Sequence, residues 1–363
     1  MERANLLEFL NKSKTLQALS FSTCNSELVN FLDLMSYDEQ FTQRIDIGLI
    51  YFAEKSVSRY FIVDGLNRIL SLSLLLHALC ECYKKTSAKN DKAIITIRTK
   101  YLFDGDKTKL KMPENMQVIY EKIVNGEKLS GKEKKTSMFK LLHHYWTQIK
   151  EDNLHASEIL KMIQKVTVTV VEAEGVNLCD LYYEINKHRK LNQLLLIKGY
   201  LSELNLDENW NNFCNIYDNK QSDLILFFKN FFQNQFNYKE FEENKLYDYF
   251  VNYFQTMCKY MKADLVLEGI KRYANLYKNL LNVNMPNEVL KQSIIDIKML
   301  GGEDTFPYLL SVYSDYDDES ISEATFVEIL ATIKEYLQNR QKTPNNVTFN
   351  ELVKYLNALL ACK

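Results

Sequence analysis

The sequence contains few of the residues that interrupt regular structure. Among its 363 residues there are 10 glycines and 4 prolines, whereas tyrosine and phenylalanine contribute 23 and 20. Because glycine and proline punctuate helices and mark turns, their scarcity favours long helices and argues against an all-β fold. We therefore expect an α+β protein that is dominated by helices.

The chain also lacks a strong net charge and a long apolar run. Its 45 lysines and arginines nearly balance 47 aspartates and glutamates, which gives a net charge of -2. Any contact with nucleic acid must therefore use a local basic patch. The amino terminus has no apolar stretch of the kind found in signal peptides, and no later run approaches the length of a membrane span. We expect a cytoplasmic protein with no membrane partner.

Cysteine and histidine are too scattered to predict a metal site. The seven cysteines are odd in number and lack the spacing of a disulfide framework, so we expect reduced thiols. Cys80 and Cys82 form a single C-x-C pair, which is more typical of buried thiols than of metal ligands. None of the five histidines lies beyond residue 188.

Residue periodicity gives a coarse map of the first half of the chain. Apolar spacing, alternation and β-branched content predict helices over 6–19 and 27–35, and strands over 44–55, 60–63, 92–103 and 166–173. A helix apolar on nearly every side is expected from residue 69 onward. Two further helices are expected on either side of a polar break at 186–190.

The most charged segment, 126–138, is expected to be an exposed loop or the start of a helix. Its lysines Lys132, Lys134 and Lys135 are interpreted as solvated, with phosphate contact as the alternative. Beyond residue 206 only helices are predicted, and the aromatic residues there recur at a spacing that suits a packed core. We therefore expect a mixed α/β domain over 1–205 and an all-α domain over 206–363.

The stretch IVDGLNR, residues 62–68, has the pattern of an anion site. A strand that ends in Asp64 and re-enters a helix within a few residues directs the first helical amides beyond the strand end. Gly65 would let the backbone approach a ligand, Arg68 would give a fork of donors to a phosphate, and Asp64 could hold a metal ion or a ribose hydroxyl. The alternative is a local pair of Asp64 and Arg68 that needs no ligand.

This stretch resembles the signature of the DGQQR-motif family, which is domain of unknown function family 262. Members carry Asp-Gly-Gln-Gln-Arg ahead of an apolar helix. Three further segments resemble family features in the family's order: 45–52 its preceding strand, 181–201 its second signature, and 306–341 its helical extension. The resemblance therefore extends over most of the chain.

The resemblance implies a small mixed sheet similar to the ParB and sulfiredoxin nucleotide-binding fold. It also implies a loop that binds and hydrolyses a nucleoside triphosphate with Mg²⁺ and so controls DNA cleavage in restriction-type, antiphage defence. On this basis Asp64 and Arg68 are the catalytic candidates, and Asp64 is the candidate Mg²⁺ ligand. The implied nucleotide-binding residues are Asp64, Gly65, Asn67, Arg68, Asn186, His188 and Lys198.

The chain departs from the family pattern at several positions. Leu66 and Asn67 replace the two motif glutamines, and an apolar leucine cannot orient a water molecule or a phosphate. Arg189 stands where the second signature usually has glycine. The early Gln-Arg pair of the family is missing near 19–29, and the histidines form no His-Asn-His nuclease pattern.

Two functions follow from this comparison. The first is a nucleotide-binding sensor or regulatory subunit of a DNA-targeting defence system, with weak or no hydrolysis and with a separate nuclease or other subunit as its partner. Basic residues beside the second signature, Lys187, Arg189 and Lys190, motivate the prediction of DNA contact. The alternative is a non-catalytic interaction or DNA-binding scaffold with a vestigial nucleotide pocket.

Overall fold

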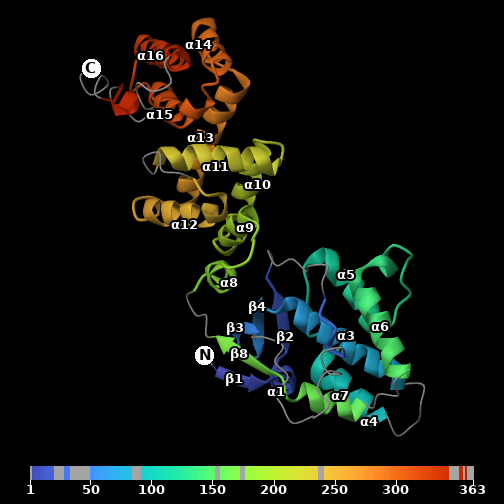
Figure 1. The fold of residues 1–363 in the computed structure, drawn as a ribbon. Coiled ribbons are helices and arrows are strands. Elements are labelled where there is room, and N and C mark those ends of the chain that lie inside the picture. Colours follow the sequence, from blue (N-terminus) through green and yellow to red (C-terminus); the bar gives the residue numbers. More distant parts are fainter. Residues whose placement is uncertain are drawn as a thin grey trace. The chain divides into compact units, whose positions relative to one another are not determined.

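The fold was analysed in a computed structural model of the chain, shown in Figure 1. By contacts the chain divides into two compact units, Met1–Arg189 and Lys190–Lys363. The structure describes residues 2–19, 28–32, 50–83, 91–151, 156–171, 176–235, 241–342, 351–354 and 356–357.

Unit 1 is built on a mixed sheet of six strands. In sheet order the strands are β1 (Glu2–Asn5), β8 (Thr167–Val171), β3 (Tyr51–Ser56), β4 (Arg59–Asp64), β2 (Thr15–Ala18) and β7 (Leu110–Lys111). The central strands β3 and β4 are antiparallel, as are β1 and β8, whereas β2 is parallel to both β4 and β7 and β3 is parallel to β8. A separate short hairpin consists of β5 (Phe103–Asp104) and β6 (Lys107–Thr108).

Helices accompany this sheet. They are α1 (Leu6–Lys12), α3 (Leu66–Tyr83), α4 (Asp91–Ile97), a π-helix (Arg98–Leu102), α5 (Glu114–Asn125), a 3-10 turn (Glu133–Lys135), α6 (Ser137–Glu151), α7 (Ala156–Ile163) and α8 (Leu178–Asn186). Helix α3 is buried along most of its length because its sequence is apolar on nearly every side. Helix α6 packs against it (Figure 1).

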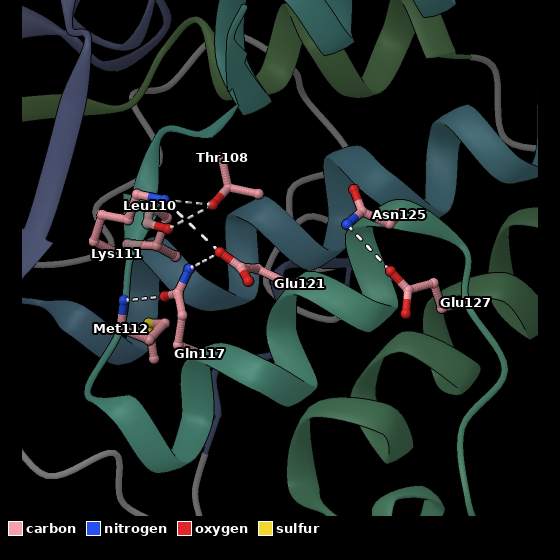
Figure 2. Close-up of polar contacts among 8 residues, drawn as sticks. All are labelled: Thr108, Leu110, Lys111, Met112, Gln117, Glu121, Asn125 and Glu127. Carbon is pink, nitrogen blue, oxygen red and sulfur yellow. Dashed lines mark hydrogen bonds and ion pairs between the residues drawn. The ribbon is translucent and has the colours of Figure 1, made fainter. Parts of the chain in front are cut away.

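Side chains hold the edge strand β7 to α5, as Figure 2 shows. The backbone N–H of Met112 donates to Oε1 of Gln117 at 2.6 Å, and the amide of Gln117 donates in turn to Glu121. Nζ of Lys111 lies 3.8 Å from Glu121 and 3.4 Å from Oγ1 of Thr108. These contacts anchor a strand only two residues long, which would otherwise form a weak sheet edge.

Unit 2 is entirely helical in its described residues. Its helices are α9 (Gln193–Glu203), α10 (Asp207–Asn215), α11 (Gln221–Gln235), α12 (Leu246–Met257), α13 (Ala263–Asn282), α14 (Glu288–Met299), α15 (Phe306–Asp317) and α16 (Glu323–Lys342), with 3-10 turns at Glu243–Lys245 and Glu303–Thr305. The α+β, helix-dominated fold class predicted from the sequence is thereby confirmed. Helix α9 belongs to this unit, whereas the sequence placed the domain boundary after it, at 205/206.

Aromatic rings fill the core of unit 2. Phe227, Phe228 and Phe231 are fully buried on α11, and the ring of Phe228 stacks with that of Trp210 on α10. The predicted core role of the second-half aromatics is therefore confirmed for these residues. Among the described helices, none combines the length and the apolar character that a membrane crossing requires. The five cysteines with described surroundings, which include Cys80 and Cys82, form no disulfide bond.

The helix predicted over 6–19 is wrong in its second half. Helix α1 ends at Lys12, and the backbone N–H of Lys14 donates to the carbonyl of Ser58 at 2.7 Å. The following strand β2 buries Leu16 and Ala18 and exposes Gln17. This alternation has the two-residue period of a strand. The leucines before it follow a helical spacing, so the sequence did not indicate where the helix ends.

The strand predicted over 92–103 is also wrong, because this segment forms α4 and the π-helix. Ile94 and Ile97 lie one turn apart and are buried, whereas Ile95 is 59% exposed. The hydroxyl of Thr99 donates to the carbonyl of Ile95 at 2.8 Å, a bond that threonine makes within a helix. Burial of one side of the helix thus decides the structure of this segment, although its β-branched residues favour a strand.

The other predictions of local structure have mixed outcomes. The strands over 60–63 and 166–173, the apolar helix after Gly65 and the helix pair around 186–190 are confirmed. The exposed start of a helix over 126–138 is confirmed as well. The predicted helix over 27–35 and the first part of the strand over 44–55 lie largely outside the described residues.

Candidate functional site

The candidate site begins at the turn between β4 and α3. A single residue, Gly65, separates the strand from the helix, and its φ of +96° is accessible to glycine but strained for other residues. A Cβ at this position would lie 2.9 Å from Cγ2 of Ile50 and 3.3 Å from Nη2 of Arg68. The turn therefore requires glycine both for its backbone angle and for space.

The carboxylate of Asp64 is bound by two arginines. Nη2 of Arg68 lies 2.9 Å from Oδ2, and Nη1 of Arg189 lies 3.4 Å from Oδ1. The side chains of Asp64 and Arg68 are 12% and 15% exposed, whereas that of Arg189 is 53% exposed. The local pair of Asp64 and Arg68 considered from the sequence is thus present, and a residue from a distant segment completes it.

The two residues that replace the motif glutamines differ in environment. Leu66 is 7% exposed and belongs to the hydrophobic core of unit 1. Asn67 is half-buried. The first substitution therefore contributes packing and supplies no polar group to the site, in agreement with the chemistry expected of leucine.

Helix α8 positions Arg189. The side chain of Asn177 begins the helix by accepting hydrogen bonds from the N–H groups of Cys179 and Asp180. At the other end the fully buried Asn186 donates through Nδ2 to the carbonyl of Tyr182 at 3.0 Å. Its own carbonyl accepts from the N–H of Arg189 at 2.8 Å.

Asn186 is therefore a positioning residue of this turn. Its Oδ1 atom is buried and has no hydrogen-bond partner among the residues that the structure describes. A buried carbonyl oxygen without a hydrogen-bond partner costs free energy, and packing of Asn186 alone does not account for it. The exposed Lys187 in the same turn pairs with Glu184.

Tyr182 is a further member of the site. Burial raises the pKa of its hydroxyl, the nearby charge of Asp64 raises it further, and the charge of Arg189 opposes this. The hydroxyl therefore keeps its proton well into the alkaline range. Sequence reasoning did not single out Tyr182, although it lies in the second signature, four residues before Asn186 and on the same helix.

The remaining predicted residues have less defined roles. His188 is exposed in the turn that carries Arg189. Lys198 is exposed on α9 and belongs to unit 2, where its charge acts on the thiol of Cys214, whose pKa burial raises to about 11. The structure thus brings together Asp64, Gly65 and Arg68 with Arg189, a residue that was expected only as part of a basic surface.

The chemistry of the site suits an anion better than a metal ion. Two guanidinium groups offer donors to phosphate oxygens, whereas both oxygens of the candidate Mg²⁺ ligand Asp64 already accept from arginines. The positive charge of these two arginines would oppose the binding of a Mg²⁺ ion at Asp64. Within the described part of the chain, no cluster of three histidine, cysteine, aspartate or glutamate side chains could hold a metal.

A second buried polar cluster lies beside α3. Nζ of Lys109 donates to the carbonyls of Leu10 at 2.8 Å and of Lys100 at 2.7 Å. The adjoining cavity, which the Ser73 and Tyr120 hydroxyl pair also lines, measures about 10 Å³. This volume accommodates one water molecule at most, so we assign Lys109 the structural role of capping two helical segments.

No protein-family model matches this chain, and no curated protein matches it either. The likeness to the DGQQR-motif family therefore rests on the residues of the motifs alone.

Proposed function

We propose that the chain is a nucleotide-binding sensor or regulatory subunit of a DNA-targeting defence system. The observation that carries this proposal is the convergence of Arg68 and Arg189 on one point at the amino end of α3. Guanidinium groups match the geometry of phosphate oxygens, and a helix amino terminus favours negative charge. The carboxylate of Asp64 lies where these two guanidinium groups converge, and we propose that a phosphate competes with it there.

Slow or absent turnover is part of the same proposal. Hydrolysis needs a polar group that orients the attacking water, and Leu66 directs an apolar side chain into the core at the position of a motif glutamine. Asp64 already accepts a hydrogen bond from an arginine on each oxygen, and the positive charge of these arginines opposes the binding of a metal ion there. Binding that reports nucleotide levels is therefore favoured over catalysis.

The link to DNA and to a separate nuclease subunit comes from the four motif resemblances. These also support the proposal that the sheet of unit 1 is related to the ParB and sulfiredoxin fold. The exposed side chains of Lys187, Arg189 and Lys190 beside the second signature agree with a basic surface. Such a surface would have to be local, because the chain as a whole is nearly neutral.

A second function is favoured by one specific observation. Because each oxygen of the Asp64 carboxylate is paired with an arginine of its own chain, that carboxylate needs no ligand. This arrangement suits a non-catalytic interaction or DNA-binding scaffold whose former pocket now serves folding. The two functions differ in whether a nucleotide stabilises the protein.

Thermal unfolding with each nucleoside triphosphate and Mg²⁺ separates them. A ligand at about 100 times its Kd stabilises a protein by about 2.7 kcal/mol, so the melting temperature of the sensor rises. Arg189→Ala should reduce this rise, since Arg189 is largely exposed and its loss leaves the fold intact. Lys187→Ala is the matched control, as it removes one charge from the same turn.

The outcomes of this experiment are distinct. A rise that Arg189→Ala weakens and Lys187→Ala preserves supports the sensor. Absence of any rise for the wild type with every nucleotide eliminates the sensor and leaves the scaffold. Phosphate release measured on the same samples tests turnover, and a rate typical of an efficient hydrolase would contradict the slow turnover inferred from Leu66 and Asp64.

A further inference from the structure

Helix α6 carries an aromatic stripe beside its buried face. The buried face, which includes Leu142 and Tyr145, packs on α3. Phe139, His143 and Trp146 follow one another at spacings of four and three residues, and their ring centroids lie 6.2 to 6.5 Å apart. His143 is exposed and the other two rings are half-buried. The stripe therefore presents the ring of His143 and part of the other two rings to the solvent, while the indole nitrogen of Trp146 is buried against the core.

Lysines lie at both ends of this stripe. Lys132, Lys134 and Lys135 precede the first turn of α6, and Lys150 falls one turn beyond Trp146 on the same side by helical periodicity. All four are exposed, and no side-chain ion pair involves them in the described part of the chain. Between residues 126 and 151 there are six lysines and three glutamates.

The nearest acidic group does not neutralise these lysines. The carboxylate of Glu133 accepts from Nζ of Lys122 on α5 and from the N–H of Ser130, each at 2.7 Å. The hydrogen bond from Lys122 is the main cause that lowers the pKa of Glu133 to about 2. The carboxylate of Glu133 is therefore paired with a lysine of α5. It does not neutralise the lysines around the start of α6.

We propose that this face of α6 binds single-stranded DNA, with bases stacked on the aromatic stripe and phosphates at the flanking lysines. Proteins that bind single strands combine a positive track for the backbone with aromatic rings on which successive bases stack. Phe139, His143 and Trp146 supply the rings, and the lysines at either end supply the track. This inference concerns a surface of α6 and does not depend on the Asp64 site.

The chemistry of the face favours this occupant over the alternatives. Duplex DNA hides its base faces, so it would use the lysines but not the rings. The stripe itself has no carboxylate or amide side chain to read a 2′-hydroxyl, which gives no preference for RNA. A protein partner would not require a positive charge at both ends of an aromatic stripe.

Binding of a labelled single strand of about 15 nucleotides tests the proposal, because this length is within typical site sizes. The fluorescence of Trp146 should be quenched on binding, whereas Trp210, the other tryptophan, is 3% exposed and should not respond. His143→Ala should weaken binding about fivefold or more, which is the loss of one stacked base. Its exposed side chain makes the variant compatible with the fold.

The lysines are tested through the salt dependence. Lys134→Ala with Lys135→Ala should reduce the slope of log K against log salt by about 1.4, since each lost phosphate contact on a single strand contributes about 0.7. The matched control is Lys220→Ala with Lys229→Ala, which removes the same charge from exposed positions of unit 2. The control should bind as the wild type does.

Each result decides the proposal. Binding with quenching, weakened by the α6 variants and unchanged in the control, supports it. Equal binding of a duplex of the same length without quenching overturns it in favour of a phosphate patch that does not stack bases. Tighter binding of the RNA strand of the same sequence reassigns the face to RNA. No binding at low salt overturns it.

Discussion

The guanidinium of Arg189 lies 3.4 Å from Oδ1 of Asp64, a residue 125 positions earlier in the chain. This contact joins the turn after α8 to the end of β4. It pairs one oxygen of the Asp64 carboxylate, and Arg68 on α3 pairs the other. The two arginines differ in burial, and this difference separates their expected contributions to stability.

Arg68→Ala should destabilise the protein by about 3 kcal/mol, because it leaves a mostly buried carboxylate with one long ion pair. Arg189→Ala should cost less than about 1 kcal/mol, since that side chain is more than half exposed and the pair is screened by solvent. Urea denaturation of both variants measures this difference. Equal losses of unfolding free energy in the two variants would show that burial does not determine how much each arginine contributes to stability.

Gly65→Ala should destabilise the protein by about 1 to 3 kcal/mol, because φ is +96° and the new methyl group would meet Ile50. Gly131→Ala is the matched control. That glycine has no heavy atom within 4 Å of the Cβ position, so its replacement should be neutral or slightly stabilising. A neutral Gly65→Ala in the same denaturation experiment would refute the tight turn.

Lys109→Met should destabilise unit 1 by about 2 kcal/mol, because it leaves the carbonyls of Leu10 and Lys100 without their donor. Lys107→Met, at an exposed position of the same hairpin, should be nearly neutral. Burial lowers the pKa of Lys109 below 10.5, so the unfolded chain binds more protons. The free energy of unfolding of the wild type should therefore exceed that of Lys109→Met by a larger amount as the pH rises toward 10.5.

Unit 2 should lose stability as the pH rises above 10. Burial raises the pKa of Tyr253 to about 12, and it raises those of Tyr217 and Tyr277 further, whereas unfolded tyrosines ionise near 10. Between these values the folded state holds more protons than the unfolded state, so the free energy of unfolding falls with pH. Tyrosinate absorbance and helical circular dichroism should change together.

Tyr253→Phe provides the comparison for this alkaline transition. The variant lacks one of the raised pKa values, so its free energy of unfolding should fall less steeply between pH 10 and 12. Tyrosinate that appears well below the loss of helical signal would show that these hydroxyls ionise in the folded protein. Such a result would contradict the effect assigned to burial.

The turn at Asp64 could be predicted because its signals are local. An apolar strand, Asp-Gly and a helix without polar faces follow one another within about 20 residues, and each has a known conformational preference. Arg189 could not be predicted as a partner of Asp64, since nothing in a sequence marks a contact over 125 positions. Tyr182 was missed for the same reason.

The failures in secondary structure have a different origin. Segment 92–103 is rich in isoleucine and threonine, which favour strands on average, but burial of Ile94 and Ile97 on one helical side decided its structure. In segment 6–19 the leucines continued an apolar pattern past the end of α1 at Lys12. Tertiary packing overrode residue preference in both cases.

The carboxylate that Arg68 and Arg189 share acts as a tethered competitor of any incoming phosphate. Tethering gives it a high effective concentration, so a ligand gains only the difference between its own attraction and that of Asp64. Competition from Asp64 therefore lowers the affinity of the two arginines for a phosphate. A site of this kind suits a ligand that is present at high concentration. Replacing the competitor by its neutral isostere, Asp64→Asn, would uncover the intrinsic affinity of the two arginines.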